Sequence, residues 1–144
     1  MRISLDTETT GVDFARGVQP FLVPTFSDEG RITFWEWDVD PMTRLPEISE
    51  GDIGEIAALI DSAELIYLHN SKFDSRALSS IGLCLPWEKV RDSFVAGHLL
   101  ASNHPHNMPD MCIEYLGEDI TEYEDTVRGV VTTCRNIAKK EHRD

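Results

Sequence analysis

Basic residues are scarce in this chain. It contains 13 Lys and Arg against 26 Asp and Glu, which gives a formal net charge of −13 and a pI near 4.6. This balance argues against a broad basic surface for nucleic acid, because contacts to phosphates ordinarily need clustered Lys and Arg. It does not exclude a protein whose carboxylates gather divalent cations, since the bound ions then present positive charge to a phosphate. Net charge alone therefore does not decide the function.

Long apolar runs and paired cysteines are also missing. Every apolar run is far shorter than the roughly 18 residues of a membrane-spanning helix, and the N-terminus turns polar too early for a secretory signal. We therefore expect a cytoplasmic protein, in the host cytoplasm if it is viral, without a membrane partner. Cys84, Cys112 and Cys134 are odd in number and widely spaced, so neither a disulfide framework nor a CxxC metal site is indicated.

The length of 144 residues, with 41% hydrophobic and 27% charged residues, predicts one soluble globular domain over 1–144. Alternation, turn residues and apolar runs predict strands over about 2–6, 20–27, 31–37 and 65–68. Apolar stripes predict helices after Ser49 and over about 71–81, 92–102, 108–116 and 122–143. The unbroken apolar run over 65–68 further indicates a central strand that is covered on both faces.

This order of elements predicts an α/β fold. The first strands should pair antiparallel, a later strand should add in parallel, and helices should flank the mixed sheet. Such an arrangement matches an RNase H-like core. Trp35 and Trp37 alternate with polar or aromatic neighbours on one strand, so they belong either to the core or to a domain interface.

Two acids follow the first strand. Asp6 and Glu8 are two positions apart, so the period of a strand sends both carboxylates to the same face, where they can share a metal ion. The alternative is a pair of solvated turn residues. The apolar strand gives way here to a turn that ends at Gly11, which leaves backbone and hydroxyl groups free to meet a ligand.

A second polar segment, His69 to Asp74, follows the apolar run over 65–68 and opens a helix. If that run lies beside the first strand, Asp74 can approach Asp6 and Glu8, and three carboxylates then surround one cleft. The alternative is that Asn70 or Asp74 caps the helix. The neighbouring Phe73 is either a core residue or a surface on which a base stacks.

These two segments resemble the first two exonuclease motifs of the DEDD superfamily. The stretches over 91–100 and 106–117 are further similar to the proofreading 3′-5′ exonuclease domain of family A DNA polymerases, the DNA polymerase I family, particularly bacteriophage versions. The resemblance implies that Asp6 and Glu8 ligate two catalytic Mg²⁺ or Mn²⁺ ions, that Asp6 bridges both, and that Asp74 holds the second through water. It implies hydrolysis at the 3′ end of a DNA strand, within replication.

The resemblance also assigns residues to the DNA strand. Asn70 and Phe73 would face its 3′ end, and Thr9 and Thr10 would contact the terminal nucleotide. Asp92 matches a recurrent aspartate of these polymerases, although capping of the helix that it precedes explains it as well. The remainder of a DNA polymerase is the implied protein partner.

The fourth acid of the superfamily has no convincing copy here. Tyr115 and Asp119 have a suitable spacing, but Gly117 between them should end the helix, so one helical face cannot present both. We expect a chain that stops before the third exonuclease motif. Three alternatives stay open: a fragment or split chain that is completed elsewhere, a non-catalytic RNase H-like module for binding or docking, and an exonuclease that trims RNA.

Overall fold

The structure is a computed structural model that describes residues 1–141, without the side chains of residues 123, 124 and 141. The chain divides into two compact units, Met1–Ala96 and Gly97–Asp144. The single domain over 1–144 stays a prediction. Among the described helices, none is both long enough and apolar enough to cross a membrane.

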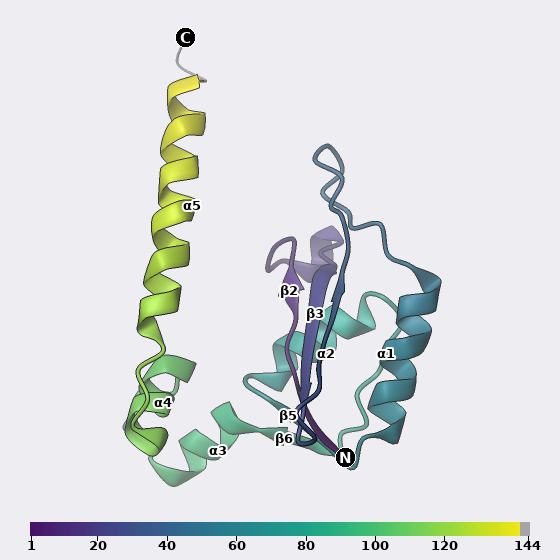
Figure 1. Cartoon of the computed structure of the whole chain (residues 1–144), viewed down its shortest axis with the longest axis vertical. Coiled ribbons are helices and arrows are strands. Elements are labelled where there is room, and N and C mark those ends of the chain that lie inside the picture. Colours follow the sequence, from purple (N-terminus) through teal and green to yellow (C-terminus); the bar gives the residue numbers. More distant parts are fainter. Residues whose placement is uncertain (142–144) are drawn as a thin grey trace. The chain divides into compact units, whose positions relative to one another are not determined.

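The first unit is built on one mixed sheet (Figure 1). Its strands are β1 (Arg2–Leu5), β2 (Glu8–Thr9), β3 (Pro20–Ser27), β4 (Ile32–Glu36), β5 (Leu65–Leu68) and β6 (Val90–Asp92). The strand order is β2-β3-β1-β5-β6, and β4 pairs with β3. Pairs among β1 to β4 are antiparallel, whereas β5 joins β1 and β6 joins β5 in parallel. The predicted α/β class and mixed sheet are confirmed, while the short strands β2 and β6 were not predicted.

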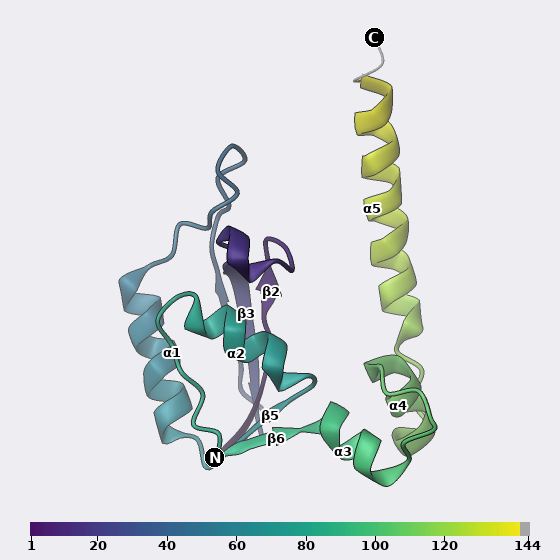
Figure 2. The ribbon, with the colours of Figure 1, turned by 180° about the vertical axis from the view of Figure 1, so that it is seen from behind.

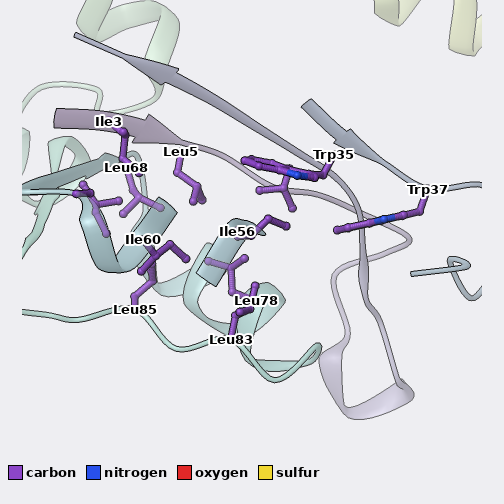
Figure 3. Packing of buried hydrophobic residues seen from close by; sticks show 13 residues of the cluster. Ile3, Leu5, Trp35, Trp37, Ile56, Ile60, Leu68, Leu78, Leu83 and Leu85 are labelled. Atoms are coloured by element: carbon purple, nitrogen blue, oxygen red, sulfur yellow. The ribbon is translucent and has the colours of Figure 1, made fainter. Parts of the chain in front are cut away.

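Two helices of this unit lie against one face of the sheet, α1 (Glu50–Ser62) and α2 (Ser71–Ser79), as seen from behind in Figure 2. They share a core with the inward side chains of the strands (Figure 3). Ile56 of α1 and Leu78 of α2 are completely buried there. The opposite face is more open, since Tyr67 of β5 is 42% exposed within the described structure. The expected burial of β5 on both faces is therefore wrong for this side chain.

Local signals fix the position of α1. Ser49 is the predicted N-cap, and its hydroxyl accepts a hydrogen bond from the backbone N–H of Asp52. The sequence left Trp35 and Trp37 either in the core or at a domain interface. The structure places both in the core, because both are buried. Their indole N–H groups donate to carboxylates of α1, from Trp37 to Asp52 at 2.7 Å and from Trp35 to Glu55 at 3.2 Å. These bonds fasten α1 to β4 and the residues after it.

The second unit is helical. It holds the end of α3 (Ser93–Leu100), then α4 (Met108–Leu116) and α5 (Thr121–Glu141). The bounds of α4 match the prediction, because Asn107 caps its start and Gly117, at φ 71°, ends it in the left-handed conformation. Tyr115 and Asp119 are accordingly not on one helical face. The predicted helix over 92–102 begins one residue late, since Asp92 closes β6.

Candidate catalytic carboxylate site

The first acids lie where β1 passes into β2. The alternation of β1 continues beyond its last residue, because Asp6 and Glu8 are exposed and Thr7 between them is buried. The backbone N–H of Asp6 donates to the carbonyl of Pro24 at 3.2 Å. This bond holds the segment between β1 and β2 against β3. The two carboxylates thus leave the chain on the same side, as the spacing predicts.

Asp74 lies in the first turn of α2 and is only 2% exposed. Its Oδ1 accepts a hydrogen bond of 2.8 Å from the Thr7 hydroxyl. Burial raises the pKa of Asp74 from its ordinary 3.8 to about 6; the Thr7 bond opposes this rise, and the nearby charges of Asp6 and Asp92 add to it. A carboxyl with such a pKa is a candidate functional group.

The negative charge of Asp6 connects the acids. Partial burial of the carboxyl raises the pKa of Glu8 above 4.5, and repulsion from Asp6 raises it further. The same Asp6 charge acts on Asp74. The charge of Asp6 thus acts on both Glu8 and Asp74, and the predicted meeting of all three carboxylates round one cleft stays a prediction. Within residues 1–141, however, no three Asp, Glu, His or Cys side chains form a ready metal-binding group.

Asp92 holds the start of α2. The N-cap position of this helix is taken by Asn70, which adopts the left-handed conformation at φ 66° and makes no side-chain cap bond. The Asp92 carboxylate instead accepts from the backbone N–H of Asn70 at 3.1 Å and of Ser71 at 2.8 Å, and from the Ser71 hydroxyl. The alternative that the side chain of Asn70 or Asp74 caps α2 is wrong, because Asp92 of the neighbouring strand β6 does so.

The same carboxylate also caps α3, as the sequence predicts. Its Oδ1 accepts from the backbone N–H of Phe94 at 2.9 Å and of Val95 at 3.3 Å. Burial acts to raise the pKa of Asp92, but the bonds from Ser71, Val95 and Asn70 outweigh it and hold that pKa below the ordinary 3.8. N–H and O–H donors thus already surround both oxygens of Asp92, which serves as a helix cap.

The predicted strand-binding residues differ in what they contact. The Thr9 hydroxyl donates to the carbonyl of Gly11, and the Thr10 hydroxyl lies 3.5 Å from the carbonyl of Gln19. Thr10 also donates its backbone N–H to Gln19 at 3.1 Å. These bonds hold the loop over 10–19 closed, and the hydroxyl oxygens keep lone pairs that can accept from a ligand.

Phe73 is neither fully buried nor isolated. Its ring meets that of Phe14 edge to face, with centroids 5.3 Å apart and an angle of 64° between the planes. Phe14 belongs to the short 3₁₀ helix η1 (Phe14–Arg16) within the loop over 10–19. Sequence reasoning missed Phe14, and no local pattern marks it, because its partner is 59 positions further along the chain.

Comparisons with known proteins give structural matches only; no family model and no curated protein matches. The chain is similar to Brucella melitensis NrnC with bound Mg²⁺, with a TM-score of 0.57, 18% identity, and coverage of 83% of this chain and 55% of NrnC. It is similar to the POL domain of Pol1 from M. smegmatis in complex with DNA primer-template and dNTP. That match has a TM-score of 0.61 and 14% identity, and it covers 82% of this chain and 19% of the Pol1 chain. It is also similar to exonuclease X in complex with 5′ overhanging duplex DNA. That match has a TM-score of 0.52 and 17% identity, and it covers 78% of this chain and 71% of exonuclease X.

The chain has the RNase H-like fold of these nucleases. At identities below one fifth the matches establish the fold and not the activity. The chain also spans about half the length of the first nucleases that it matches, 53% and 55%. Which residues act, and on what, is therefore a matter for proposal.

Proposed function

We propose that this chain is a metal-dependent 3′-5′ exonuclease module that removes nucleotides from the 3′ end of a DNA strand. The observation that carries the proposal is that the charge of Asp6 acts on both Glu8 and Asp74, in a fold shared with nucleases. Mutual repulsion among these acids is a cost that a bound divalent cation would remove. Their all-oxygen donors suit Mg²⁺, and Mn²⁺ can substitute.

Asp6, Glu8 and Asp74 would hold the ions. When bound, a pair of such ions supplies an activated water and charge stabilisation for the leaving 3′ oxygen. The chain's own residues position the acids. Thr7 orients the carboxylate of Asp74 through its hydrogen bond, and Asp92 fixes the turn from which α2 begins.

Four further residues would hold the strand. The exposed part of the Phe73 ring offers a surface on which a terminal base can stack. Asn70 projects from the left-handed turn just before Asp74 and is exposed, so its amide can bond a nucleotide. The hydroxyl oxygens of Thr9 and Thr10 border the loop that follows Glu8, where they can accept from the sugar or base.

The test is degradation of a 3′-recessed, end-labelled DNA with Mg²⁺ or Mn²⁺ and with EDTA as control. The proposal expects a ladder that shortens from the 3′ end, that needs metal, and that disappears in Asp6→Ala. Asp61→Ala, at the exposed end of α1, serves as the matched control and should cut like the parent. Equal cutting by the Asp6→Ala variant would refute the metal assignment.

A non-catalytic binding or docking module is the second candidate. It is favoured by the lack of a ready three-ligand metal group within residues 1–141 and by the acidic composition. It predicts nucleic-acid binding without metal and no cleavage. A chain that is folded, binds Mn²⁺ and does not cut would instead support a split or partial site completed by another segment.

The substrate and the partner are separate parts of the proposal. We infer a proofreading role beside a DNA polymerase of the family A type. The test adds a polymerase that lacks its own exonuclease. RNA trimming is the competing assignment, because no residue of the site is seen to read a 2′ hydroxyl. Matched DNA and RNA oligonucleotides would separate the two, and faster trimming of RNA would contradict proofreading.

A further inference from the structure

Two open clefts border the loop that leaves the carboxylate site. The first, of about 310 Å³, lies between residues 10–18 and residues 43–45 and includes the side chains of Arg16 and Arg44. The second, of about 530 Å³, lies between residues 12–15 and the end of α2 and includes Arg76. Val12 and Asp13 line both clefts, so the clefts adjoin at this loop.

We propose that these clefts bind the phosphate backbone of a single-stranded polynucleotide whose 3′ end enters the carboxylate site. The proposal deepens the proposed function and names arginines that the motifs do not include. Arginine suits the task because its planar guanidinium donates two parallel bonds to a phosphate. In a chain with a net charge of −13, such local positive groups decide where a polyanion can approach.

The loop is fastened to the carboxylate site at two points. At its base, Thr10 is bonded to Gln19, directly after β2, which contains Glu8. At its tip, Phe14 packs on Phe73, the residue before Asp74. A strand that leaves the acids along this loop therefore passes the clefts at once.

Arg44 is held in an unusual backbone conformation. It is one of two non-glycine residues at positive φ among those described, at 60°, and the other is Asn70 of the candidate site. A turn on Asp40 imposes it, since the Asp40 carboxylate accepts from the N–H of Met42 and Thr43 and the Asp40 carbonyl accepts from the N–H of Arg44. Left-handed non-glycine residues occur preferentially where ligands are held.

The guanidinium of Arg44 reaches back toward the loop. Its Nη2 donates to the carbonyl of Thr10 at 3.4 Å, which uses one of its five N–H donors. Among the described residues, neither Arg44 nor Arg76 is in an ion pair, whereas Arg16 pairs with Asp13 at 3.1 Å. Of the three arginines that line the clefts, Arg44 and Arg76 are thus best able to donate to a phosphate.

The experiment measures binding separately from cleavage. Fluorescence anisotropy follows a labelled single-stranded oligothymidylate on the full chain carrying Asp6→Ala, in EDTA, with oligouridylate as a second arm that distinguishes DNA from RNA. Arg44→Ala and Arg76→Ala should each weaken binding several-fold, and Arg44→Lys should recover part of the loss. Each lost contact should also reduce the slope of log K against log salt by about 0.7.

Arg31→Ala is the matched control. Arg31 lies in the turn after β3, and the eight residues of β3 separate that turn from β2 by roughly 25 Å. It should bind as its parent does. The inference fails if the Arg44 and Arg76 variants bind like the Arg31 variant, or if their parent binds neither oligonucleotide.

Cleavage assays on the same arginine variants, now with Asp6 in place, distinguish a failure of this inference from a failure of the proposed function. Loss of binding in Arg44→Ala and Arg76→Ala by a chain that never cuts would support the strand path and contradict the exonuclease. Metal-dependent cutting with an unchanged KM in both variants would support the exonuclease and contradict the strand path. A raised KM at an unchanged kcat supports both.

Discussion

The hydroxyl of Thr7 donates a hydrogen bond of 2.8 Å to the carboxylate of Asp74, a residue 67 positions further along the chain. The bond joins the end of β1 to the first turn of α2. It is the direct link between the two segments that carry the acids. Because both groups are buried, the bond orients Asp74 and stabilises its ionised form against the larger, opposing effect of burial.

Thr7→Val should raise the pKa of Asp74 above about 6, since the bond from Thr7 stabilises the ionised carboxylate. Thr7→Ser, which keeps the hydroxyl, should leave the pKa closer to that of the parent. Carbon-13 NMR titration of the side-chain carboxyl measures both. An unchanged pKa in the valine variant would show that burial alone sets the value.

Asp6→Asn should lower the pKa of both Glu8 and Asp74, because the charge of Asp6 raises each of them. The same NMR titration reports the two carboxyls separately. Asp61→Asn, at the exposed end of α1, should change neither. If only one carboxyl responds, the three acids do not form one electrostatic group.

Asp74 should make the protein more stable in mild acid than at neutral pH. Its pKa is 3.8 unfolded and about 6 folded, so the folded state binds the proton more tightly. The resulting stabilisation is complete below pH 3.8 and is lost as the pH rises through 6, an effect of at most about 3 kcal/mol. Other carboxylates also titrate in this range. The contribution of Asp74 is therefore the difference in pH-dependent unfolding free energy between the parent and Asp74→Asn.

Asp74→Asn should remove that part of the pH dependence. The variant should be more stable than the parent at pH 7, where the parent keeps a buried charge. Urea unfolding at pH 5 and pH 7 for both proteins gives the difference. A parent and variant with the same change in unfolding free energy between the two pH values would contradict the raised pKa.

Asp92→Ala should destabilise the fold by about 2–4 kcal/mol, because one carboxylate caps both α2 and α3. Ser49→Ala, which removes the single cap of α1, should cost about 1 kcal/mol and is the natural comparison. Asp92→Asn keeps an acceptor oxygen and should fall between the parent and the alanine variant. Thermal or urea unfolding ranks the three, and equal costs for Asp92→Ala and Ser49→Ala would argue against a double cap.

The sequence by itself determined the local elements. Strands β3 and β5 and helix α4 have the predicted bounds, since alternation, apolar runs and capping residues such as Asn107 act over a few positions. The alternation through Asp6, Thr7 and Glu8 likewise follows from the period of a strand. The roles of the acids in catalysis stay predictions.

Tertiary structure alone decided the long-range partners. Strands β2 and β6, of two and three residues, are too short to show a period and exist because β3 and β5 pair with them. The contact of Phe14 with Phe73 and the capping of α2 by Asp92 join residues 59 and about 20 positions apart. No spacing rule reaches that far, because such contacts depend on which strands lie side by side, and the whole sheet settles that order.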